Sequence, residues 1–549
     1  MVDAAETPAW SRRHSQVFGL SVLALALVPW TVRHWPSQDG PNHLAVAHVL
    51  ATYTEPGSPF PAYWSVQTGL TPSTALYTVL AVAARFVPLP IAEKCLVSLT
   101  LLVLPLSVLL FTRHAVPRRA VNAMLALPLV LGWAFAMGFL SFQLAMGLGV
   151  VTLALAWEPS GADTGIRLRH GLASVAYLLC VWWHPVVALM TGLVLLLLEW
   201  KSLLRRTTWL RVLLVVGPAA VFLVGGYLAA PAPPQASVTP PETHFSDPLS
   251  VVGAAFEYNI AYSPFELVPR VAALVVLFFF AYRALRAHPP HRSGAEAAVG
   301  RVVAALLALY VVMPGTLAGW YYCSARFLLY GLLLLPAAAE LPPRAARRLL
   351  VLGPALAGAV LAIQWPSIRR ASQQMQDVLD VGVSLPRGAK LVPMDFNVSV
   401  LGPQPTGASW AELVVAHDAV ASQVFAAGKP RMGGERFRTL SFRPGVPDPR
   451  TGVLPWSGFE MWNDVWRPCS PPDSPLRWFV HDDQTSCSAA LAARKQALEE
   501  VIDRYDYVLM VGPATYGQDL MAPHLRLLSH VGSAWMYTIV HPSSPAQPG

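Results

Sequence analysis

The stretch VFGLSVLALALVPWTVRHWPSQDGPNH, residues 17–43, joins a long apolar run to a polar turn. The run 17–33 is long enough to cross a bilayer core, which needs about 20 apolar helical residues and tolerates about 17. Arg12 and Arg13 precede it, and no clear small-residue cleavage site follows. We therefore interpret it as the first membrane span, with residues 1–16 in the cytoplasm.

The composition of the whole chain agrees with this interpretation. Apolar residues make up 54% of the 549 residues and charged residues 13%, where soluble domains carry about 25% charged residues. The formal net charge of +8 comes from short basic clusters between long apolar runs, a distribution typical of cytoplasmic loops. The sequence therefore predicts a polytopic α-helical membrane protein and no nucleic-acid partner.

Further apolar runs predict a transmembrane domain over residues 17–366. The stretch 171–200 is too long for one span and is expected to cross twice, turning near His184 before Pro185. The segment 70–87 is interpreted as a re-entrant or interfacial helix within an external loop, 34–90, because every basic cluster then becomes cytoplasmic. The total is then 11 spans, the others being 17–33, 91–112, 119–136, 139–157, 207–229, 269–288, 299–316, 325–341 and 346–366.

Residues 367–549 differ in composition from residues 17–366, with frequent charged residues and only short apolar runs. Residues 367–382 are typical of an amphipathic helix near the membrane surface, and 488–504 of another helix. Strands are predicted at Lys390–Phe396, Tyr505–Val511 and Trp535–Val540. This alternation indicates a small α/β domain, and the odd number of spans makes it extracytoplasmic.

Two of the five cysteines, Cys469 and Cys487, lie in this polar region. Outside the cytoplasm they could form a disulfide bond, because oxidising compartments let such bonds persist. Two free thiols fit the sequence equally well.

The turn after the first span holds the most informative candidate for chemistry. Gly40 and Pro41 force a turn that presents Asp39 at the lipid–water boundary, and residues 43–52 then resume a helical pattern. A carboxylate there could act as a general base, or it could simply cap the following helix. The residues alone leave both roles open.

Motifs for other chemistries are missing from the sequence. It contains no Walker phosphate loop, no H-E-x-x-H helix, no C-x-x-C pair and no G-x-S-x-G elbow. No metal site or cofactor is predicted.

The arrangement resembles the GT-C superfamily of membrane glycosyltransferases, which use polyprenyl-linked sugars. In that superfamily an acidic motif, often Asp-Glu, follows the first span, and a Pro-containing segment precedes the second. Asp39 matches the first acid, and Pro72–Tyr77 is similar to the later segment. Gly40 replaces the second acid, which weakens a metal-dependent mechanism and also permits an inactive relative.

The resemblance implies transfer of a sugar from a polyprenyl-phosphate donor to an acceptor at the external face, with Asp39 as the base. Arg326 is the candidate partner of the leaving phosphate, or a snorkelling anchor at a span boundary. Four further residues are candidates for substrate binding, although each histidine could instead be structural or interfacial and Glu257 a solvated loop residue: Tyr322, His43, His184 and Glu257.

Two functions from other classes remain as alternatives. A transporter of a lipid-linked polymer would need paired ionisable groups within the spans, which contain few. A non-catalytic envelope assembly protein would use the C-terminal domain to bind partners. In each case we expect a protein of a bacterial inner (plasma) membrane; the sequence identifies neither the sugar nor the acceptor.

Overall fold

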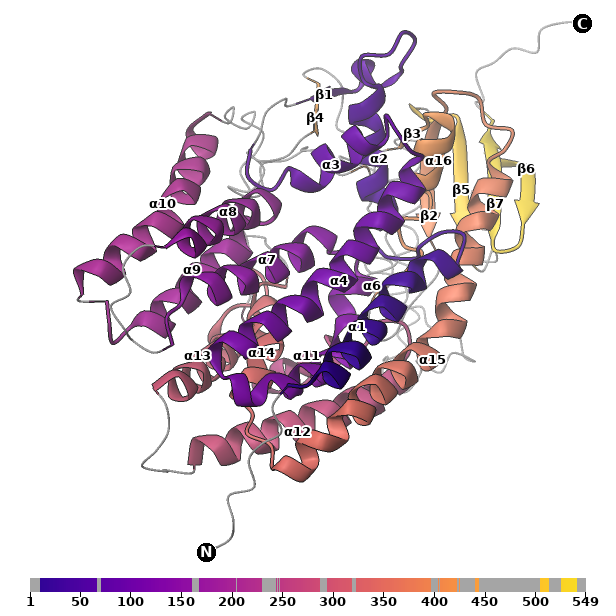
Figure 1. Ribbon diagram of the computed structural model, residues 1–549. Coiled ribbons are helices and arrows are strands. Elements are labelled where there is room, and N and C mark those ends of the chain that lie inside the picture. The colour runs from indigo at the N-terminus through magenta and orange to yellow at the C-terminus, as the bar shows by residue number, and fades with distance from the viewer. Residues whose placement is uncertain are drawn as a thin grey trace, which may run out of the picture.

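The computed structural model describes residues 10–66, 71–159, 167–203, 205–229, 243, 245, 247–286, 294–317, 322–395, 403, 405–421, 424, 440–443, 504–512 and 525–540. Within these ranges the chain is mostly helical, with a helical bundle and a smaller region that contains a β-sheet (Figure 1).

Long apolar helices form the bundle, so the chain is an integral membrane protein. Among the described residues, six segments are long and apolar enough to cross a bilayer. They are Arg12–Thr31 (α1, Arg12–Leu27, with η1, Val28–Thr31), Leu89–Ala115 (α4), Arg206–Ala229 (α10), Pro264–Arg283 (η4, Pro264–Glu266, and most of α12, Leu267–Arg286), Gly294–Val312 (α13) and Pro343–Val381 (α15).

Shorter apolar helices complete the bundle: α7 (Leu140–Ala156), α8 (Leu168–Trp183), α9 (Pro185–Glu199) and α14 (Cys323–Ala338). The predicted turn near His184 is confirmed. His184 has extended backbone angles (φ −159°, ψ 99°) between α8 and α9, as expected before a proline. The total of 11 spans stays a prediction.

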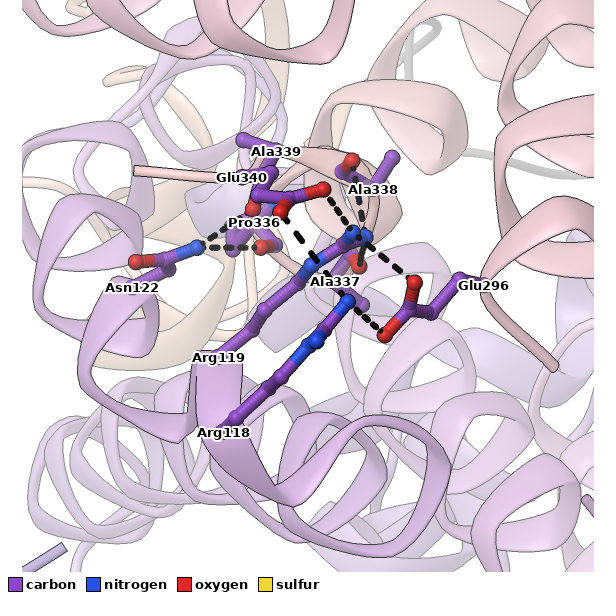
Figure 2. A network of polar contacts seen from close by, with 9 residues as sticks. All are labelled: Arg118, Arg119, Asn122, Glu296, Pro336, Ala337, Ala338, Ala339 and Glu340. Carbon is purple, nitrogen blue, oxygen red and sulfur yellow. Dashed lines mark hydrogen bonds and ion pairs between the residues drawn. The ribbon is translucent and has the colours of Figure 1, made fainter. Parts of the chain in front are cut away.

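The predicted span 119–136 is wrong as a single helix. The chain there forms a 3₁₀ helix, η3 (Pro117–Ala126), then α5 (Leu127–Val130) and α6 (Trp133–Ala136), with a break around Leu131. Side chains of η3 bond across to another helix instead (Figure 2). Arg119 donates to the carbonyls of Ala337 and Ala338 at 3.1 Å, and Asn122 donates to that of Ala339 at 2.8 Å. These bonds pair carbonyl groups at the C-terminal end of α14 that have no partner within the helix.

The direction of α4 separates the two ends of the bundle. Near its N-terminal end, Lys94 Nζ donates to the carbonyl of Val32, at the end of the first span, at 2.7 Å. At its last turn, Arg113 lies 6.0 Å from the ring centroid of Trp10, just before α1. The helices α1 and α4 are therefore antiparallel, and Asp39 lies at the opposite end of α4 from Arg119.

The chain between the first span and α4 forms α2 (Gly40–Thr52), η2 (Phe60–Ala62), β1 (Trp64–Val66) and α3 (Ala75–Ala83). The nine residues of α3 are too few to cross a bilayer, in line with the prediction for 70–87. Apolar side chains of this loop, including Val46, Phe60 and Trp64, share one buried core with residues of the C-terminal region. Strand β1 also pairs with β4 (Leu440–Phe442). The first loop and the C-terminal region thus pack as one unit.

The C-terminal region contains a five-stranded mixed sheet in the order β3-β2-β5-β7-β6. Its strands are β2 (Lys390–Asp395), β3 (Val420–Ala421), β5 (Tyr507–Val511), β6 (Leu525–Val531) and β7 (Ala534–Ile539). Three of them match the predicted strands. Helix α16 (Ala411–His417) lies beside α2, and α15 runs from the bundle to the sheet (Figure 1).

One prediction in this region needs correction. Residues 367–382 do not form a separate helix on the membrane surface, because α15 continues through Pro366 to Val381. Ser529 Oγ donates to the carbonyl of Val381 at 2.8 Å and ties the end of α15 to the sheet. The helix predicted at 488–504 lies outside the described residues.

Candidate active site

The Asp39 turn is held by the backbone of the segment that follows α6. Gln38 N–H donates to the carbonyl of Ala136 at 2.8 Å, and Asp39 N–H to that of Met137 at 3.0 Å. The next residue, Gly138, has a φ of +79°, and a Cβ there would lie 2.7 Å from the amide nitrogen of Gly40. Only glycine fits this close approach without displacing the turn.

The structure argues against the capping role for Asp39. The residue stands directly before α2, but its side chain makes no capping hydrogen bond. Within the described ranges no hydrogen bond or ion pair is recorded for its carboxylate, and the residue is half-buried. Burial raises the pKa of Asp39 to about 7, because a carboxylate removed from water without a compensating cation holds its proton more tightly.

A second carboxylate lies beside Gly40. A Cβ on Gly40 would come within 2.2 Å of Ser37 Oγ and 2.8 Å of Glu93 Oε1. Glu93, near the N-terminal end of α4, is only 3% exposed. In the described part of the chain, neither its Oε1 nor Ser37 Oγ has a hydrogen-bond partner. The space that a side chain at position 40 would need is thus already taken by Glu93.

Glu93 is not among the site residues predicted from the sequence. A signal was present, since Glu93 and Lys94 are adjacent charges at the start of an otherwise apolar predicted span, 91–112. Ionisable residues at such positions are frequently functional.

His43 lies one turn into α2 and contacts Tyr77 of α3, with 3.1 Å between His43 Nδ1 and the tyrosine hydroxyl. Burial lowers the pKa of His43 to about 4. The imidazole is therefore neutral at pH 7, and it can serve a ligand as a hydrogen-bonding group but not as a cation.

The C-terminal region supports α2 from the other side. His48 Nε2 lies 2.6 Å from Asp418 Oδ1, and Arg387 pairs with the same carboxylate. A further buried acid, Glu412 of α16, is only 3% exposed, and burial raises its pKa to about 7. The first loop and the C-terminal region are thus joined by charged as well as apolar contacts.

The segment 131–143 links Asp39 to the predicted substrate-binding residues. Tyr322, in a left-handed conformation (φ +59°) before α14, packs edge-to-face on Trp133 with 4.8 Å between ring centroids. Farther along the segment, Phe142 contacts both Arg326 (5.7 Å from Cζ to the ring centroid) and His184 (5.5 Å between centroids).

Buried polar atoms at this end of α7 and α9 are left without partners among the described residues. They include Gln143 Oε1 and His184 Nδ1. Unpaired buried polar atoms are uncommon in folded proteins and often mark a site where a ligand or water binds. Arg326 and His184 therefore share surroundings suited to a polar ligand, whereas no direct contact between Arg326 and Asp39 is recorded.

A buried network supports the Asp39 turn from the α12 side. Arg270 (1% exposed) pairs with Glu266 (0% exposed) at 2.9 Å, and Glu266 also accepts a hydrogen bond from Gln364 of α15. Glu266 Oε1 accepts the N–H of Tyr262 at 2.7 Å, and the Tyr262 hydroxyl donates to the carbonyl of Pro36 at 2.7 Å. The chain three residues before Asp39 is thereby fixed to two long helices.

Some of the predicted residues cannot be placed. Glu257 ends α11 (Pro248–Glu257), but its side chain lies outside the described part of the structure, as do Cys469 and Cys487. Within the described ranges, no three His, Cys, Asp or Glu side chains come close enough together to hold a metal ion.

The chain shares its fold with a solved structure over nearly its whole length, so the predicted resemblance is confirmed at the level of the fold alone. The chain is similar to the apo crystal structure of ArnT from Cupriavidus metallidurans, with a TM-score of 0.51 and 12% identity over 96% of this chain and 98% of ArnT. For ArnT bound to undecaprenyl phosphate, the TM-score is 0.46 and the identity 14%, over 97% of this chain and 99% of ArnT. For the arabinofuranosyltransferase AftD from Mycobacteria, the TM-score is 0.46 and the identity 12%, over 98% of this chain and 40% of AftD.

The sequence itself matches no family model, and no curated protein matches it either. At identities this low the similarity concerns the fold alone.

Proposed function

We propose that the protein is a membrane glycosyltransferase that moves a sugar from a polyprenyl-phosphate donor to an acceptor hydroxyl, with Asp39 as the general base. The observation that carries the proposal is the environment of the Asp39 carboxylate, namely its burial and its lack of a recorded partner among the described residues. It is half-buried, it caps no helix, and no ion pair neutralises it within the described ranges. The fold shared with ArnT supports the class of reaction.

In the proposed step, the acceptor oxygen attacks the anomeric carbon while its proton passes to Asp39. The bond from that carbon to the donor phosphate oxygen breaks, and the lipid phosphate leaves with the electron pair. Displacement from the opposite face inverts the anomeric centre, as in inverting glycosidases, with the acceptor in place of water. A pKa of about 7 suits Asp39 for this role, because a base works best when its pKa lies near the operating pH.

The leaving phosphate needs donors, since a general acid is not required for so good a leaving group. We assign Arg326 to this role, with His184, Tyr322 and His43 as neutral partners for the sugar or phosphate. Arginine suits phosphate because its planar guanidinium can donate two parallel hydrogen bonds. ArnT has been crystallised with undecaprenyl phosphate, which motivates a polyprenyl phosphate as the lipid here. Glu257 remains a candidate for the acceptor side.

The site is assigned to the external face of the membrane. Arg12, Arg113, Arg118 and Arg119 gather at the end of the bundle opposite Asp39. Cytoplasmic ends of membrane helices carry an excess of arginine and lysine, which supports a cytoplasmic N-terminus and an external Asp39.

The test is a transfer assay in proteoliposomes with a panel of polyprenyl-phosphate pentoses and hexoses and envelope glycans as acceptors. We expect Asp39→Asn to lower the transfer rate by about 10²–10⁴-fold, the usual contribution of a general base, without loss of folded protein. Asp247→Asn is the matched control, because Asp247 accepts the Ser250 N–H (3.0 Å) before α11 and asparagine caps helices equally well.

Turnover by Asp39→Asn equal to that of the wild type would overturn the role of Asp39. If the wild-type protein bound none of the donors and transferred none of the sugars, the proposed function itself would fall.

A further inference from the structure

A basic groove lies between the end of the first span and the middle of α15, apart from the candidate active site. Its volume is about 600 Å³. One wall is the segment 31–33, and the other is the face of α15 that carries Arg369, Arg370, Gln373 and Gln376. Neither Asp39 nor Arg326 lines it.

All the charged side chains that line the groove are positive. Arg33, Arg369 and Arg370 are exposed, and within the described ranges no ion pair is recorded for any of them. No acidic side chain lines the groove, and two of its lining residues donate to carboxylates beyond it: Gln373 Nε2 to Asp377 at 3.0 Å and Gln376 Nε2 to Asp380 at 2.6 Å. Three arginines along a groove that no carboxylate lines leave a positive potential that favours an anion.

Buried contacts hold both walls in place. The His34 backbone N–H donates to Ser372 Oγ at 3.1 Å, and His34 Nε2 lies 2.9 Å from Gln376 Oε1. His34 is buried at 7% exposure. In the same segment, two residues before His34, the carbonyl of Val32 accepts a hydrogen bond from the buried Lys94 at 2.7 Å. The spacing between Arg33 and the α15 arginines is therefore fixed by the fold.

The groove also lies where two helices leave the bilayer. The first candidate span ends at Thr31. Helix α15 has 39 residues, or about 58 Å at 1.5 Å per residue, whereas a bilayer core is only about 30 Å thick. Its apolar part ends near Pro366, so Arg369 and Arg370 follow directly at the height of lipid headgroups.

We propose that this groove binds the phosphate group of an anionic membrane lipid. Guanidinium groups match phosphate oxygens with paired, charge-assisted hydrogen bonds, and the Ser372 hydroxyl is a further polar group beside them. The opening at the membrane boundary makes a lipid headgroup the source of the phosphate. A bound lipid would link the first span to α15, the helix that carries the C-terminal region.

The test uses the full chain in nanodiscs with a phosphatidylglycerol that carries a photoreactive group near its glycerol. We expect crosslinks to peptides that contain residues 31–33 or 366–376, and none there from a diacylglycerol with the same photoreactive group. Arg369→Gln/Arg370→Gln should reduce these crosslinks by about tenfold, as expected when charge-assisted hydrogen bonds are lost. Arg33→Gln, on the opposite wall, should reduce them in the same direction.

Arg347→Gln/Arg348→Gln is the matched control, since it removes two exposed arginines near the other end of the same helix and should leave the groove crosslinks unchanged. Equal labelling by diacylglycerol, or full labelling of Arg369→Gln/Arg370→Gln, would overturn the proposal. Complete competition by inorganic phosphate would assign the groove to a soluble phosphate rather than to a lipid. The assay requires no sugar transfer, so its outcome is independent of the role of Asp39.

Discussion

In the described part of the chain, the end of the helical bundle with η3 pairs its buried arginine with carboxylates, whereas the Asp39 end holds, besides the buried Arg270–Glu266 pair, two acids for which no ion pair is recorded. At the end with η3, Arg119 is 4% exposed and reaches Glu340 at 3.0 Å and Glu296 at 3.5 Å, while Arg118 pairs with Glu296 as well (Figure 2). At the other end, Asp39 is half-buried and Glu93 is buried. No ion pair is recorded for either carboxylate among the described residues.

The difference separates structural charges from candidate functional ones. A buried charge is tolerated when partners compensate for the lost water, as they do around Arg119. An uncompensated buried carboxylate destabilises the folded state, and such groups cluster at functional sites, where their altered pKa is useful. We therefore propose a stabilising role for Arg119, in contrast to the catalytic role proposed for Asp39.

The largest expected effect on folding is at the paired end. Arg119→Gln leaves buried carboxylate and carbonyl groups without their donor, and we expect it to lower the free energy of unfolding by about 3–5 kcal/mol. Arg118→Gln, which removes a half-exposed partner of the same Glu296, should lower it by about 1 kcal/mol or less. Thermal unfolding in detergent measures both; equal effects would show that burial of Arg119 is not decisive.

The next effect concerns the backbone that holds the Asp39 turn. Gly138→Ala forces a left-handed conformation on alanine, which costs about 1–2 kcal/mol, and also drives a Cβ against the Gly40 amide. Gly57→Ala is the control, because Gly57 has nearly the same φ (+78°) but no atom within 4 Å of the added Cβ. We expect Gly138→Ala alone to reduce the transfer rate. Equal activity of the two variants would mean that the segment 136–138 does not position Asp39.

A smaller effect is expected at Arg326, across the segment 131–143 from Asp39. Loss of one charged hydrogen bond to the donor phosphate corresponds to about 1.5–3 kcal/mol. Arg326→Gln should therefore reduce kcat/KM by about 10–150-fold, since each 1.36 kcal/mol is a factor of ten. Arg85→Gln, at an exposed position after α3, should change neither kcat nor KM. An unchanged kcat/KM for Arg326→Gln would contradict a role in phosphate binding and favour the alternative, a membrane anchor.

The sequence predicted the features that depend on local pattern. Apolar run length located most of the helices, and Pro185 predicted the break at His184. Gly40 and Pro41, which were expected to form a turn before a helix at 43–52, are instead the first residues of α2. What it missed depends on contacts between distant segments. The run 119–136 is apolar enough for a helix, but Arg119 and Asn122 bond to α14 instead. Glu93 lies 53 residues from Gly40 in sequence, so no local pattern could place its carboxylate there.

The pH dependence of a single turnover tests the central claim most directly. Only deprotonated Asp39 can accept the proton of the acceptor. Because burial raises its pKa to about 7, the rate should rise about tenfold per pH unit below that value and level off above it. A rate that is constant between about pH 5 and pH 8 would contradict a base with a raised pKa at this position.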